Sequence, residues 1–123
     1  MIKKTVTYND FDGKERTEDF YFNLTETELA ELELSHAGGL KKAIEKIIAA
    51  QDSNALIKIF KDIVILSYGE KSPDGRRFIK TQDVVDAFTQ TEAYSSIFME
   101  LAFNDVAAAE FINGLPSKGA KKQ

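Results

Sequence analysis

The chain has 123 residues and a net charge of −4, and it contains no cysteine. Its apolar fraction of 43% and charged fraction of 29% are ordinary for a single globular domain. Without cysteine there is no disulfide scaffold and no thiolate zinc site, and the single histidine, His36, excludes a histidine-rich metal centre. The net negative charge argues against general electrostatic attachment to nucleic acid or to a membrane. Nothing after Met1 resembles a signal peptide, and no apolar run is long enough to span a bilayer, so we expect a cytoplasmic protein.

The first 24 residues predict a β-hairpin. Residues 2–8 and 20–24 alternate with a period of two between an inward and an outward face. A turn signal, Asp12-Gly13, lies between the two segments. The residues expected to face inward are Ile2, Lys4, Val6 and Tyr8 in the first segment and Phe20, Phe22 and Leu24 in the second. Because a hairpin alone is only marginally stable, this face must pack on the rest of the chain.

From Thr25 onward the apolar spacing becomes helical and predicts about six short helices. The first begins at a capping box, Thr25-Glu26-Thr27-Glu28. The third helix, roughly residues 54–68, is apolar around most of its circumference, which is typical of a central helix covered on several sides. The predicted fold is therefore α+β and mostly α, with a hairpin at 1–24 and a helical part at 25–116 around this central helix. Residues 1–116 should form one domain, and the basic tail 117–123 is expected to be disordered.

Residues 72–80, with the sequence SPDGRRFIK, place three cations beside a turn in an otherwise acidic chain. Pro73 suits the second position of a type I turn that begins at Ser72. The cations could bind an anion or a nucleic acid, but nearby carboxylates offset their charge, and nucleic-acid binding normally needs a contiguous basic face. We favour a polar connector that orients the C-terminal helices, with its arginines paired to carboxylates on neighbouring helices. A polar contact of Arg76 or Arg77 with a partner stays open.

No group of residues predicts catalysis. The sequence contains no pairing of a nucleophile with a base and no glycine-rich phosphate-binding pattern. The segment containing Asp10, Asp12 and Gly13 faintly resembles a calcium loop, but Tyr8 occupies the position of the first ligand. We therefore expect no enzyme activity, no cofactor and no metal.

Aromatic residues are a more informative feature, since the chain has nine phenylalanines and four tyrosines. Many of them lie in the second half of the chain, where they either pack in the core or form a partly exposed surface for the helices of a partner or of a second subunit. The candidate partner-binding residues are Phe78, Phe88, Tyr94, Phe98, Leu101 and Phe111.

Four stretches of the second half resemble the tail assembly chaperones of long, non-contractile-tailed bacteriophages, especially those that infect Gram-positive hosts. These stretches are YGEKSPDGRRFIK at residues 68–80, FTQTEAY at 88–94, FMEL at 98–101 and AAAEFING at 107–114. The resemblance extends over nearly the whole chain and is strongest from about residue 57 to residue 115. None of these residues performs a chemical reaction in such a family.

The resemblance implies that the protein binds the tape measure protein, a long helical chain that sets tail length, and keeps it soluble until tail tube subunits polymerise around it. It further implies action in the host cytoplasm, absence from the mature virion, self-association, and a longer form, made by ribosomal frameshifting, that recruits tube subunits. This chain would be the short form. Lys121-Lys122 fits a slippery site, because adjacent lysines are often encoded by A-rich codons. The alternative is a small phage-encoded nucleic-acid-binding regulator, which salt-dependent DNA binding would reveal.

Overall fold

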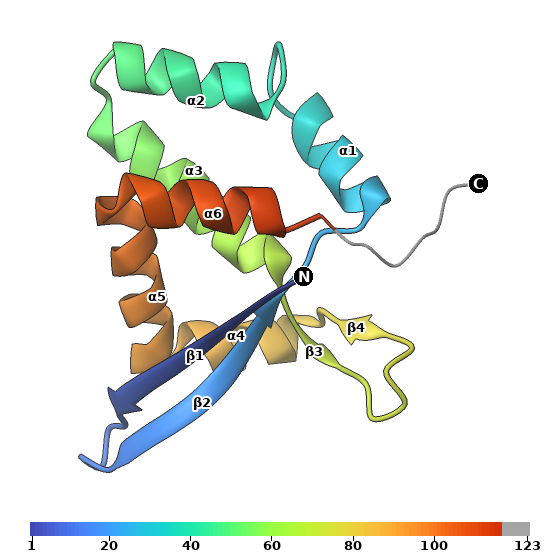
Figure 1. Ribbon diagram of the computed structural model, residues 1–123, viewed down its shortest axis with the longest axis vertical. Coiled ribbons are helices and arrows are strands. Elements are labelled where there is room, and N and C mark those ends of the chain that lie inside the picture. The colour runs from blue at the N-terminus through green and yellow to red at the C-terminus, as the bar shows by residue number, and fades with distance from the viewer. Residues whose placement is uncertain (117–123) are drawn as a thin grey trace.

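The computed structural model describes residues 1–116, which form a twisted antiparallel sheet packed against helices (Figure 1). Within these residues the sheet has four strands in the order β1-β2-β3-β4. The strands are β1 (Ile2–Asn9), β2 (Glu15–Phe22), β3 (Tyr68–Lys71) and β4 (Phe78–Ile79). The helices are α1 (Glu26–Leu34), α2 (Leu40–Ala49), α3 (Ser53–Ser67), α4 (Gln82–Thr89), α5 (Glu92–Phe103) and α6 (Asp105–Gly114). The predicted α+β class and the six helices are confirmed.

The N-terminal hairpin forms with the predicted faces. Strands β1 and β2 pair in antiparallel register from Ile2 opposite Phe22 to Asn9 opposite Glu15. All of the residues predicted to face inward are buried or partly buried, whereas the residues between them on β1 are exposed. The hairpin therefore packs its apolar face on the helices of its own chain, with β1 lying against α5.

The helices begin where side chains satisfy the free amide groups of their first turns. The predicted capping box is present at α1: the Thr25 hydroxyl accepts a hydrogen bond from the Glu28 amide at 3.2 Å, and the Glu28 carboxylate accepts one from the Thr25 amide at 3.0 Å. The residues that cap α3 to α6 are Asp52, Thr81, Thr91 and Asn104.

An aromatic cluster joins the sheet to the helices. The fully buried ring of Phe22 on β2 lies 5.7 Å from Tyr68, 5.8 Å from Phe88 and 5.2 Å from Phe111, measured between ring centroids. Phe88 also stacks on Tyr68 at 4.0 Å. Since these residues come from β2, β3, α4 and α6, the cluster holds together segments that are far apart in the sequence. Burial raises the pKa of the Tyr68 phenol to about 12, with the nearby Glu70 carboxylate adding to the effect, so the ring is neutral in the core.

Helix α3 is the predicted central helix, but it is not covered all round. Ile63 and Val64 are fully buried, and the helix packs on α2 and α5. Ile57 and Leu66, by contrast, are partly exposed, with 39% and 38% of their surface accessible. The helix runs from Ser53 to Ser67, within one residue of the predicted 54–68 at each end, and the chain then continues into β3.

The prediction that residues 72–80 form a polar connector between helices is wrong. They belong to a second hairpin, because β3 pairs with β2 (Tyr21 opposite Gly69) and with β4 (Glu70 opposite Ile79). The turn itself was predicted correctly, since the Gly75 amide donates to the Ser72 carbonyl at 2.9 Å. Strands of four and two residues are too short to show a period of two, and the pairing of β3 with β2 depends on the tertiary structure.

The ends of the described segment lie side by side. The Leu24 amide donates to the Leu115 carbonyl at 2.9 Å, and the Met1 amino group donates to the Gly114 carbonyl at 3.1 Å. Helix α6 is thereby fastened to both ends of the N-terminal hairpin. The predicted disordered tail, residues 117–123, lies outside the described residues. In the part of the chain that the structure describes, no helix is long and apolar enough to cross a membrane.

Lys80 connects the second hairpin to the start of α1, and this contact predicts a pH dependence of stability. Its amino group lies 2.7 Å from the Glu28 carboxylate and donates to the Asn23 carbonyl at 2.7 Å. Burial alone would raise the pKa of Glu28, but the hydrogen bonds from Lys80 and from the Thr25 amide lower it below its ordinary value of 4.5. Since the pKa is lower in the folded state, this stabilisation is present above pH 4.5 and is lost as the pH falls through the folded-state pKa.

We expect Lys80→Met to lower the free energy of unfolding by about 1 kcal/mol at neutral pH, because it removes a mostly buried ion pair. The difference from the wild type should shrink as the pH falls through the folded-state pKa of Glu28, because protonated Glu28 no longer forms the ion pair. Urea denaturation over a series of pH values from neutral into the acid range measures it. Lys3→Met, on the exposed face of β1, is the control. A difference that stays constant with pH would contradict the role of Glu28.

Candidate partner-binding surface

The six aromatic and apolar residues proposed from the sequence do not form one surface. Phe88, Leu101 and Phe111 are buried, with at most 3% of their surface accessible. Phe78, Tyr94 and Phe98 are partly buried. The ring of Tyr94 lies between Phe88, at 5.4 Å, and Phe98, at 6.1 Å. Three of the six residues therefore belong to the core, and the other three keep some accessible surface.

The two arginines proposed for a polar contact lie in the β3–β4 turn. Their backbone amides are held there: the Arg76 amide donates to the Asp74 carboxylate at 3.1 Å, and the Arg77 amide donates to the Ser72 hydroxyl at 3.0 Å. Both residues are exposed. The prediction that they pair with carboxylates of neighbouring helices is wrong for residues 1–116, where the ion pairs are made by Lys4, Arg16 and Lys80. Figure 1 shows the β3–β4 turn extending away from the helices.

Sequence reasoning missed a different set of exposed apolar residues. Phe11 at the hairpin tip exposes 78% of its surface, Met99 and Phe103 on α5 expose 50% and 72%, and Val106 at the start of α6 exposes 68%. Leu34 at the end of α1 exposes 87%. Helical spacing could have revealed part of this set, because Met99 and Phe103 lie four residues apart on the face of α5 opposite its buried residues.

A wide groove of about 630 Å³ lies between the hairpin tip and the first half of α5. Its walls combine apolar side chains with small serines. From the hairpin they are Tyr8, Asn9, Asp10, Phe11 and Gly13, and from α5 they are Glu92, Ser95, Ser96 and Met99. Two distant parts of the chain thus build one open concave surface, and Figure 1 shows the hairpin tip and the start of α5 close together at the lower left.

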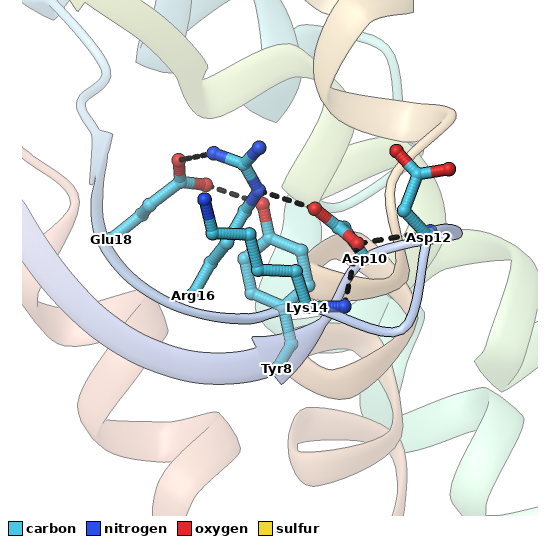
Figure 2. A network of polar contacts seen from close by, with 6 residues as sticks. All are labelled: Tyr8, Asp10, Asp12, Lys14, Arg16 and Glu18. Atoms are coloured by element: carbon cyan, nitrogen blue, oxygen red, sulfur yellow. Dashed lines mark hydrogen bonds and ion pairs between the residues drawn. The ribbon is translucent and has the colours of Figure 1, made fainter.

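A polar network holds the hairpin tip in shape (Figure 2). The Asp10 carboxylate accepts hydrogen bonds from the Asp12 and Lys14 amides, both at 2.9 Å, and from the Arg16 guanidinium at 2.7 Å. The bond from Arg16 and then that from the Lys14 amide hold the pKa of Asp10 below its usual value. Below the tip, the Tyr8 hydroxyl donates to the Glu18 carboxylate, which raises the pKa of Tyr8. The Asp10 carboxylate therefore accepts three hydrogen bonds within the tip, and these bonds fix the turn that carries Phe11.

A second pocket of about 440 Å³ separates α2 from α6. Leu40 and Ile44 line it on one side, and Ala109 and Ile112 line it on the other. Its rim carries both signs of charge, with Lys41 beside Glu33 and Glu45. This pocket is narrower and more apolar than the groove at α5, and the opposite charges on its rim favour no particular charge on a ligand.

Among the described residues, no group of histidine and acidic side chains could hold a metal ion. The model of a protein family described as "Phage tail assembly chaperone" matches residues 1–122 of the chain. Neither the search of curated proteins nor the search of solved structures returned a match. A match over this length includes both hairpins and all six described helices, and a family of chaperones is not a family of enzymes. The chain therefore belongs to the phage tail assembly chaperone family.

Proposed function

We propose that this chain binds the tape measure protein of its phage, keeps that long helical protein soluble, and helps to recruit tail tube subunits during tail assembly. The observation that carries the proposal is the family match over residues 1–122. Exposed apolar side chains support it, because a protein that covers the apolar stripe of a client helix must offer apolar surface of its own. The net charge of −4 would help to keep the complex in solution.

The proposal includes the cellular setting. The chain would act in the host cytoplasm, would leave before the virion is complete, and would be the short form of a pair whose longer member arises by frameshifting near Lys121-Lys122. A Gram-positive host and self-association of the chain on its client belong to the same proposal. Sequencing the DNA downstream of these codons tests the longer form, and sedimentation of the purified chain tests self-association.

Co-expression with the tape measure protein encoded by the same phage tests the central claim. We expect the tape measure protein to appear mainly in the soluble fraction when this chain is present, and in the pellet when it is replaced by an unrelated acidic protein of similar size. The two proteins should also co-purify through a tag on either one. Equal precipitation of the tape measure protein in both cases would contradict the proposal.

A further inference from the structure

We propose that the outer face of α5, together with the hairpin tip, docks an amphipathic helix whose apolar stripe is flanked by lysine or arginine. The outer face of α5 is defined here as Glu92, Ser95, Ser96, Met99 and Phe103, and the hairpin tip is represented by Phe11. That the natural partner is the tape measure protein rests on the proposed function, but the chemistry of the docking surface does not.

The residues of this face lie on one side of the helix. At 3.6 residues per turn, they project within an arc of about 100° along the length of α5. The buried residues Ala93, Ile97 and Leu101 project from the opposite side into the core. The 12 residues of α5 rise about 18 Å, which is enough to lie along about three turns of a partner helix.

The groove beside this face has a shape that suits a helix. Ser95 and Ser96 are the small side chains of its α5 wall, so another backbone can approach closely there, while Phe11 and Met99 provide apolar contacts above them. Tyr8 and Asp10 are held by the hydrogen-bond network of the hairpin, so the hairpin side of the groove is already formed before a partner binds. A preformed surface binds more tightly because less conformational freedom is lost.

The acidic charge of this region favours a partner helix that carries lysine or arginine. Between residues 81 and 116 every ionisable charged residue is acidic: Asp83, Asp86, Glu92, Glu100, Asp105 and Glu110. The two charged residues that line the groove are also acidic, Asp10 and Glu92. Asp10 is paired with Arg16, and Glu100 is paired with Lys4 at 3.0 Å. Among the described residues Glu92 makes no ion pair, so it remains to attract a cation at the edge of a bound helix.

The experiment uses the full chain and two synthetic peptides of about 18 residues, five helical turns. Both peptides carry the same leucine stripe, and the positions that flank it are lysine in one and glutamate in the other. We expect fluorescence anisotropy to show at least about tenfold tighter binding of the lysine peptide. The double variant Phe11→Ser, Met99→Ser should weaken that binding by about tenfold or more, since it removes two apolar contacts.

The matched control is Leu34→Ser, which removes an exposed apolar side chain from α1, outside the groove. It should leave the binding of the lysine peptide unchanged. Urea denaturation of each variant confirms that it is folded before binding is compared. A third variant, Glu92→Lys, should weaken the lysine peptide and strengthen the glutamate peptide, a reversal that loss of folding would not produce.

Three outcomes would overturn the docking inference: equal binding of both peptides, unchanged binding by the double variant, or self-association of the wild type that the double variant abolishes. The last outcome would assign this face to a second copy of the chain.

A co-expression experiment tests the docking surface and the proposed function separately, by measuring the solubility of the tape measure protein. If the double variant loses the lysine peptide but still keeps that protein soluble, the tape measure protein does not dock on this face, and the proposed function stands. If the wild type binds the lysine peptide but does not keep the tape measure protein soluble, the function is wrong and the surface stands.

Discussion

Phe88→Ala is expected to lower the free energy of unfolding by about 3–5 kcal/mol, the usual cost of replacing a buried phenylalanine with alanine. Only 2% of the Phe88 surface is accessible, and the ring stacks on Tyr68 at 4.0 Å and lies 5.3 Å from Phe20 and 5.8 Å from Phe22. Removing it would leave a cavity at the point where β2, β3 and α4 meet. Because the sheet and helices share this one aromatic cluster, we expect the whole domain to lose stability.

Urea denaturation measures this loss as a lower transition midpoint with an unchanged slope. The matched control is Phe103→Ala, since Phe103 is also a helical phenylalanine but exposes 72% of its surface. We expect Phe103→Ala to change stability by no more than about 0.5 kcal/mol. Phe88 was also a candidate partner-binding residue. If Phe88→Ala kept full stability and lost only the binding of the client, Phe88 would belong to the partner surface and our assignment to the core would be wrong.

Gly69→Ala should destabilise the protein by about 1–3 kcal/mol, because a side chain at this position meets atoms that are already in place. A Cβ atom there would lie 2.6 Å from Cε2 of Phe78 and 2.9 Å from the backbone oxygen of Ile79. Both distances are shorter than van der Waals contact. Strand β4 would have to move away from β3, and the small hairpin would lose part of the pairing between its two strands.

A double-mutant cycle with Phe78→Ala separates the two clashes. That substitution removes the ring but leaves the Ile79 carbonyl, so the cost of Gly69→Ala should be smaller in the Phe78→Ala background without disappearing. Urea denaturation of the four proteins provides the required free energies. Full stability of Gly69→Ala would mean that β3 and β4 do not approach this closely, and it would restore the interpretation of residues 72–80 as a loose connector.

The features that the sequence predicted correctly are governed by local rules. The period of two at residues 2–8 and 20–24 predicted the faces of the first hairpin, because neighbouring side chains of a strand point to opposite sides. The capping box at Thr25 and Glu28 predicted the start of α1, since its hydrogen bonds join residues only three apart. The turn from Ser72 to Gly75 was predictable for the same reason. The family resemblance, in turn, agrees with the family model over residues 1–122.

The errors arose where distant contacts decide the structure. Residues 68–71 become a strand because β2 offers its free edge at Tyr21 and Phe22, which no local pattern could show. Helical spacing shows which side chains share a face of a helix, but it does not show which face is covered. The sequence therefore could not show that three of the candidate partner-binding residues are buried: Phe88, Leu101 and Phe111. Among the described residues Arg76 and Arg77 form none of the predicted ion pairs, because the β3–β4 turn extends away from the helices (Figure 1).

The sequence by itself determined the class of fold, the start of the first helix, the first hairpin and the family. These follow from hydrogen bonds and side-chain directions within a few residues of each other, and from similarity along the chain. Only the tertiary structure decided which apolar residues are buried and which remain at the surface. Met99 and Phe103 are exposed because α5 turns Ile97 and Leu101 toward the core, and the groove at Phe11 exists because the hairpin ends beside α5. Burial depends on what packs against each face, and that is a property of the whole domain.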